Sequence, residues 1–94
     1  MELKDTIEMM QSADYKERFK AEYQQTKIRY EKLKAFNTKI EAAQRTEWCE
    51  KPRCKCAEIP KHDCPAELLR EQQHIMGEYL HILEVRAVIE GIDL

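Results

Sequence analysis

The chain has 94 residues, a length typical of one small domain (residues 1–94), with a net charge of −2 and only two Gly and three Pro. So few turn residues argue against a hairpin-rich β fold, and the abundance of Glu, Lys, Gln, Ala, Leu and Arg is typical of long helices. No run approaches the roughly 20 apolar residues of a membrane span, and residues 1–20 mix acidic and basic side chains, which argues against a secretory signal. The composition predicts a soluble, cytoplasmic, all-α protein.

The first predicted elements are a short amphipathic helix over residues 3–11 and a long helix over residues 13–46. Ser12 is placed to cap the long helix, because its hydroxyl can accept a hydrogen bond from a free backbone N–H group. The long helix contains no Pro or Gly and would measure roughly 50 Å. Its recurring positions, three or four residues apart, are Tyr15, Phe19, Tyr23, Thr26, Tyr30, Leu33, Phe36 or Asn37, and Ile40. This period predicts one stripe that packs against another helix.

A cysteine-rich loop over residues 47–64 follows this helix. It holds all four cysteines of the chain, which are Cys49, Cys54, Cys56 and Cys64, and His62 lies near the last of them. Thiolates are the preferred ligands of structural zinc, so the segment predicts a zinc site held by these cysteines, with His62 as a substitute for one. Two disulfides or four reduced thiols stay open as alternatives. No Glu lies in an H-E-x-x-H pattern, so catalytic zinc is not expected.

A second long helix is predicted over residues 65–90. Pro65 suits the first turn of a helix, and Asp63 or Cys64 is placed to cap it. Gly91 is placed to end the helix in a left-handed conformation. The long helices are therefore predicted to form an antiparallel hairpin.

This second helix carries more apolar surface than one partner helix can cover. One stripe comprises Leu68, Ile75, Tyr79, Ile82 and Ile89, and the other comprises Leu69, Met76, Leu80, Leu83 and Ala87. A hairpin buries only one of them, so the pattern predicts a homo-oligomer that forms through the exposed stripe. Gly77, inside the helix, indicates a close approach of a neighbouring helix.

The charges are distributed unevenly. Residues 13–46 carry a net charge of +4 and residues 65–94 a net charge of −4. Two antiparallel helices of opposite sign would attract each other, or the basic segment would attract an anionic partner. The acidic balance of the whole chain argues against a duplex-DNA binder.

No residues suggest catalysis, because the single Ser fits a helix cap and no Gly-rich phosphate loop is present. His74 and His81 fit a solvated helix face. Residues 15–30 combine aromatic rings, which either belong to the core or stack on nucleobases, with Lys and Thr side chains that bind phosphate. The candidate ligand-binding residues are Tyr15, Lys16, Tyr23, Thr26, Lys27 and Tyr30. A twofold axis would bring two such sets together, which suits a ligand with two bases and two phosphates.

Four segments carry a family resemblance: ERF at 17–19, TKIRYEKLKAF at 26–36, PAELLREQ at 65–72 and M-x-x-YLHILEVRAVIEGI at 76–92. They resemble small phage-encoded helical-hairpin proteins related to a crAss-like phage family and, more distantly, the hairpin domain of anti-CBASS and anti-Thoeris sponge proteins. The resemblance implies a homo-oligomer, typically a hexamer, that sequesters cyclic di- or trinucleotides or cyclic ADP-ribose-type signals without catalysis. It implies ligand contacts by the same six residues. The four-cysteine loop departs from this family.

Two other functions stay open from the sequence. One is a zinc-stapled helical module that binds a protein partner through the exposed apolar stripe, as an anti-defence or regulatory adaptor would. The other is a nucleic-acid-binding hairpin that uses the basic helix, although the acidic balance of the chain counts against it.

Overall fold

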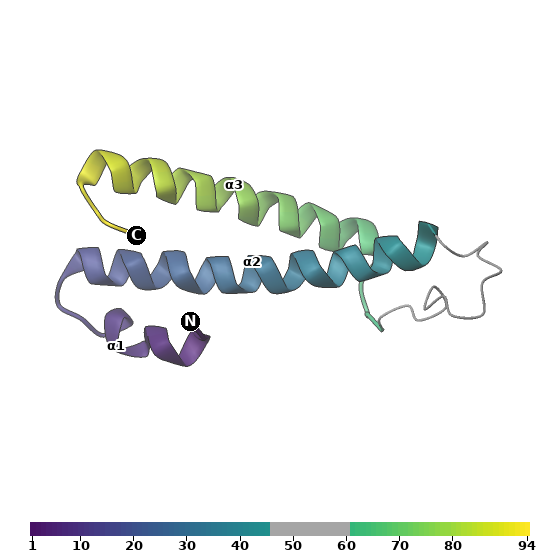
Figure 1. Cartoon of the computed structure of the whole chain (residues 1–94), viewed down its shortest axis with the longest axis horizontal. Coiled ribbons are helices and arrows are strands. Elements are labelled where there is room, and N and C mark those ends of the chain that lie inside the picture. Colours follow the sequence, from purple (N-terminus) through teal and green to yellow (C-terminus); the bar gives the residue numbers. More distant parts are fainter. Residues whose placement is uncertain (46–60) are drawn as a thin grey trace.

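The computed structural model describes residues 1–45 and 61–94, and every described element is helical. The elements are the 3₁₀ helix η1 (Leu3–Thr6) and the α-helices α1 (Ile7–Met10), α2 (Tyr15–Arg45) and α3 (Ala66–Glu90). The helices α2 and α3 lie side by side and run in opposite directions, while η1 and α1 lie against the N-terminal half of α2 (Figure 1). The all-α class is thus confirmed for the described residues.

The N-terminal segment is a 3₁₀ turn followed by one short α-helix, rather than the single helix predicted over residues 3–11. Thr6 is fully buried and its hydroxyl donates to the backbone oxygen of Leu3 at 2.7 Å. Gln25 Nε2 in turn donates to Thr6 Oγ1 at 2.9 Å, which ties the segment to α2.

The long helix α2 begins at Tyr15, because Asp14 and not Ser12 occupies the capping position. Asp14 Oδ1 accepts a hydrogen bond from the backbone N–H of Lys16 at 3.0 Å. The backbone oxygen of Asp14 accepts a hydrogen bond from the backbone N–H of Arg18 at 3.2 Å. Ser12 Oγ accepts the N–H of Asp14 at 3.1 Å and so shapes the preceding turn. The prediction of Ser12 as the cap was wrong, since both residue types accept such bonds and only their spacing to the helix decides.

The ends of α3 test two more predictions. Pro65 lies at the N-cap with no side-chain capping bond, so the predicted caps Asp63 and Cys64 were wrong; the backbone oxygen of Pro65 instead accepts the N–H of Leu68 at 3.1 Å. Gly91 has φ 70 and ψ 33, which confirms the left-handed terminator. The chain then turns back, and Ile92 N–H donates to the backbone oxygen of Ala87 at 2.8 Å.

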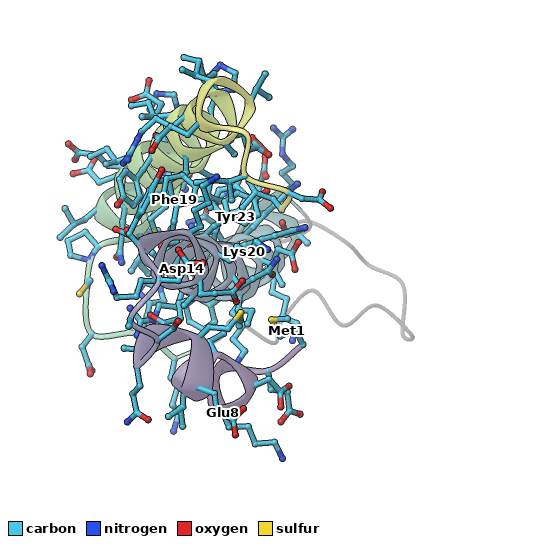
Figure 2. The ribbon with its side chains drawn as sticks, turned by 90° about the vertical axis from the view of Figure 1, so that its left-hand side faces the viewer. Met1, Glu8, Asp14, Phe19, Lys20 and Tyr23 are labelled. Atoms are coloured by element: carbon cyan, nitrogen blue, oxygen red, sulfur yellow. The ribbon has the colours of Figure 1, made fainter. Side chains whose placement is uncertain are left out.

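The core lies between α2 and α3. It comprises Phe19, Tyr23, Leu80, Leu83, Ala87 and Ile92, with Tyr30 packed against it. Figure 2 shows Phe19 and Tyr23 on the side of α2 that faces α3, with the N-terminal segment on the opposite side. Of the two predicted stripes on α3, the one that contains Leu80, Leu83 and Ala87 faces the core, and the other is exposed. The predicted surplus of apolar surface is confirmed.

Among the described helices, none combines the length and the apolar composition that crossing a membrane would require.

Candidate ligand-binding groove

The six sequence-predicted residues are spread along the first half of α2. They occupy α2 from its first residue to its middle, over about 22 Å along the helix axis. Tyr15 and Lys27 are exposed, Lys16, Thr26 and Tyr30 are half-buried, and Tyr23 is buried.

Tyr23 belongs to the core and links the two long helices. Its hydroxyl donates to Glu84 Oε2 at 2.9 Å, and its ring lies 6.0 Å from the Nζ atom of Lys27. Burial, together with the hydrogen bond to Glu84 and the charges of Glu84 and Glu31, raises the pKa of Tyr23. The hydrogen bond and the packed ring identify Tyr23 as a contact between helices.

A second tyrosine–carboxylate hydrogen bond joins α2 and α3. The Tyr79 hydroxyl of α3 donates to Glu22 Oε1 of α2. This hydrogen bond is the largest cause of the raised pKa of Tyr79, followed by burial and the charge of Glu22. The two helices therefore exchange tyrosine–carboxylate bonds in both directions.

Of the predicted set, Tyr30 lines a groove in the surface of the described residues. This open groove, with a volume of about 910 Å³, lies between α2 and α3. From α2 it is lined by Tyr30, Lys34, Asn37, Thr38 and Glu41, and from α3 by Arg70, Gln73, His74, Gly77, Glu78, His81 and Ile82. Sequence reasoning placed the ligand residues toward the start of α2, whereas the groove lies toward its C-terminal half.

Gly77 gives Tyr30 its place in the groove. A Cβ atom at position 77 would lie 3.3 Å from Tyr30 Cε2, tighter than most contacts of real Cβ atoms. The absent side chain thus lets the ring lie against α3. This close approach is within one chain, so the association of copies that Gly77 was predicted to support stays a prediction.

The groove carries two cations, Lys34 and Arg70, and two carboxylates, Glu41 and Glu78. Glu41 pairs with Arg45 at 3.0 Å and Glu78 contacts His74 Nε2 at 3.2 Å. Within residues 1–45 and 61–94, no carboxylate lies within 4.0 Å of the cationic groups of Lys34 or Arg70. The positive charges of Lys34 and Arg70 are therefore available for phosphate oxygens, which form short charge-assisted hydrogen bonds with such groups.

Asn37 is the one strongly buried polar side chain that lines the groove, with 6% of its surface exposed. Its Nδ2 atom donates to the backbone oxygen of Leu69 at 3.1 Å and to Gln73 Oε1 at 2.9 Å. Its Oδ1 atom has no hydrogen-bond partner within the described part of the chain. Buried polar atoms are nearly always paired, so this oxygen can accept one donor. The sequence signal for this residue was an amide side chain at a position of the helical repeat where core residues are expected.

Of the predicted zinc ligands, only Cys64 and the predicted substitute His62 lie within the described residues. Cys49, Cys54 and Cys56 lie outside the described residues, and Cys64 is exposed just before α3. His62 contacts the backbone oxygen of Cys64 through Nδ1, and its ring lies edge-on to Phe36, with 6.2 Å between ring centroids. Structural zinc stays a prediction.

Together these features define a helical protein with a polar groove between two antiparallel helices. Residues 13–55 and 59–89 match the Sequestin family, and because these segments cover most of the chain, the protein belongs to that family. No curated protein and no solved structure shows a significant match to it. The name of the family denotes sequestration of a molecule, which agrees with a binding role.

Proposed function

We propose that this protein sequesters a nucleotide immune signal without catalysis. The ligand is a cyclic di- or trinucleotide or a cyclic ADP-ribose-type molecule, and the protein acts as a phage anti-defence sponge in the cytoplasm of the host cell. Membership of the Sequestin family supports sequestration, and the chemistry of the groove supports an anionic ligand with an aromatic base.

The observation that carries the proposal is the set of groups that line the groove. Lys34 on α2 and Arg70 on α3 offer unpaired positive charges, and the half-buried ring of Tyr30 lines the same groove. Phosphates bind such cations, and nucleobases stack on aromatic rings with about 1–3 kcal/mol per base. The groove therefore offers cations for the phosphate of a nucleotide and an aromatic ring for its base.

The sequence-predicted residues outside the groove are proposed to contact ligand or to support the helix pair. Tyr15, Lys16, Thr26 and Lys27 lie on α2 before Tyr30 and carry aromatic, cationic and hydroxyl groups. We propose that they contact ligand at a seam between copies in a homo-oligomer, while Tyr23 supports the helix pair from within the core.

The experiment is a ligand panel of cyclic di-AMP, cyclic di-GMP, cyclic tri-AMP and cyclic ADP-ribose, read by thermal unfolding. A ligand that binds only the folded protein raises the melting temperature, by about 4–8 °C for each kcal/mol of binding stabilisation. We expect at least one ligand to do so and to be recovered chemically intact after the protein is denatured.

The variants Lys34→Ala and Arg70→Ala locate the site. Each is expected to weaken the binding of that ligand by about tenfold, the effect of losing one charge-assisted contact. Lys39→Ala is the matched control, because Lys39 is an exposed cation of α2 outside the groove. Loss of binding in Tyr15→Ala with Lys27→Ala, but not in the groove variants, would move the site to the first half of α2.

A flat response across the panel, or a ligand recovered in hydrolysed form, would contradict the proposal. The flat response would favour the protein-interaction module, which the exposed apolar stripe of α3 supports.

We also propose that Cys49, Cys54, Cys56 and Cys64 hold one structural zinc ion. Metal analysis of the purified protein is expected to give about one zinc per chain. A content below about half a zinc per chain would contradict this site.

A further inference from the structure

The outer face of α3 carries a strict heptad repeat. We define this face by Leu68, Ile75, Ile82 and Ile89, which follow one another at intervals of seven residues and are 51%, 55%, 55% and 77% exposed. An apolar repeat of seven keeps the same face of a helix toward one long helical partner. The repeat runs through nearly all 25 residues of α3, a length of about 37 Å.

No described element of the chain covers this face. Tyr79 and Val85 border the four residues and are also partly exposed, at 38% and 45%. Isolated exposed apolar residues are ordinary, but a continuous row along a whole helix marks an interaction surface. The required partner is a helix of similar length with a matching apolar row.

The charges beside the outer face indicate the direction of that partner. In a parallel pair of α3 helices, Glu71 and Glu78 would each lie level with the same residue of the second copy, and like charges repel. In an antiparallel pair with a twofold axis between Glu78 and Tyr79, Leu68 lies level with Ile89 and Ile75 with Ile82. The same alignment sets Glu71 level with Arg86, a residue of opposite charge.

We propose that a second copy of this chain packs antiparallel on the outer face of α3, about a twofold axis between Glu78 and Tyr79. A heptad row with four apolar positions is symmetric about its own centre, so each copy supplies the complement of the other. The pairing rests on the apolar repeat and the charges of α3, and it is independent of the identity of any ligand.

The second copy also changes the groove. Glu78 and Ile82 line the groove and lie on or beside the outer face. A partner helix along that face therefore forms an outer wall of the groove in both copies, and the two grooves lie beside the twofold axis. The ligand site named in the proposed function is then complete only in the pair.

Sedimentation velocity across micromolar concentrations tests the pairing. We expect the wild-type protein to contain an even number of chains and Ile82→Glu to raise the dissociation constant of the pair about a hundredfold or more, because a charge would be buried without a partner. Val88→Glu is the matched control, since Val88 is 84% exposed on the same helix but stands outside the repeat. It is expected to leave the pair intact.

A charge exchange tests the direction. Glu71→Arg and Arg86→Glu are each expected to weaken the pair by about tenfold, and the double variant to restore it. Positions 71 and 86 are about 22 Å apart along one helix, so restoration requires contact between copies. Arg86 also contacts Glu90 and the ring of Phe19 in its own chain, but a loss of those contacts would not be repaired by Glu71→Arg. Lys39→Glu on α2 makes the same charge change as Arg86→Glu and is expected to have no effect.

Three results would overturn the proposal: wild-type protein that stays a single chain at about 100 μM, an assembly with an odd number of chains, or a double variant no better than its parents. Closure of the groove has its own test, in which Ile75→Glu, on the outer face but outside the lining of the groove, weakens the binding of the ligand found in the panel by about tenfold. Unchanged binding would refute the closure. A flat ligand panel beside an intact, even-numbered assembly would refute the proposed function and leave the pairing standing.

Discussion

The two apolar faces of α3 have similar residues and opposite environments. The inner face places Leu80, Leu83 and Ala87 against α2, where each is nearly inaccessible to solvent. The outer face carries residues of the same kind at a heptad spacing and leaves at least half of each exposed. Apolar burial stabilises a fold in proportion to the area removed from water, so the inner face contributes most of the stability that α3 gives to the single chain. The comparison teaches that apolar content alone does not identify a core; the partner does.

The largest expected effect separates the two faces directly. Leu83 is 1% exposed, and Leu83→Ala is expected to lower the free energy of unfolding by about 3 kcal/mol through lost burial and a residual cavity. Ile82→Ala, one residue earlier, is expected to change the stability of the single chain by less than about 0.5 kcal/mol. Urea unfolding at several protein concentrations is the measurement. The effect of Ile82→Ala should grow with concentration, because association stabilises the folded state, and that of Leu83→Ala should not. Equal effects of the two variants at high dilution would contradict the distinction.

A smaller effect is expected at the polar contact beside the inner face. Tyr23→Phe removes the hydrogen bond to Glu84 and is expected to lower the free energy of unfolding by about 1 kcal/mol at neutral pH. Glu84→Gln keeps an acceptor and is the control, with a smaller expected loss. No change in Tyr23→Phe would mean that water replaces the bond at no cost.

The same tyrosine predicts a pH dependence. The pKa of Tyr23 is raised in the folded protein above the ordinary value of 10.0. The unfolded chain therefore loses this proton first, so the stabilisation is complete below about pH 10 and is lost as the pH rises through the raised pKa. Tyr79 adds to the same loss through its bond to Glu22. Stability measured from pH 8 to 11 should fall less steeply in the variant with both Tyr23→Phe and Tyr79→Phe, and an unchanged slope would contradict the assignment.

The smallest effect on stability is expected at Gly77, which lies between the two faces. Gly77→Ala gains about 1 kcal/mol of helix propensity, but the new methyl group displaces the ring of Tyr30, so the two effects oppose each other. We expect little change in the melting temperature and about a threefold loss of affinity for the ligand found in the panel. Gly91→Ala is a contrasting control, since its left-handed backbone makes any side chain unfavourable and it lies outside the groove. An unchanged affinity in Gly77→Ala would show that the position of the Tyr30 ring does not affect ligand binding.

The repeating patterns predicted the helices well, because apolar period and breakers act locally. Gly91 as a terminator and the surplus stripe of α3 were both readable from spacing alone. The cap of α2 was not, since Ser12 and Asp14 are both good caps and the choice depends on the turn that precedes the helix. The groove was missed for a different reason. It requires knowing which residues of α3 lie beside Lys34 and Asn37, and that alignment is a property of two helices together.

Asn37 contributes to this alignment, together with the bonds of Tyr23 to Glu84 and of Tyr79 to Glu22. The two bonds that Asn37 donates reach a backbone oxygen and a side chain on the facing helix, at positions 69 and 73. An apolar interface tolerates sliding, but a slip of one turn, about 5.4 Å, would break both bonds and strand a buried amide. The two walls of the groove therefore keep a constant axial offset, which holds Lys34 and Arg70 at a set separation. A buried amide thus limits sliding between two helices that apolar packing alone would leave free to shift along each other.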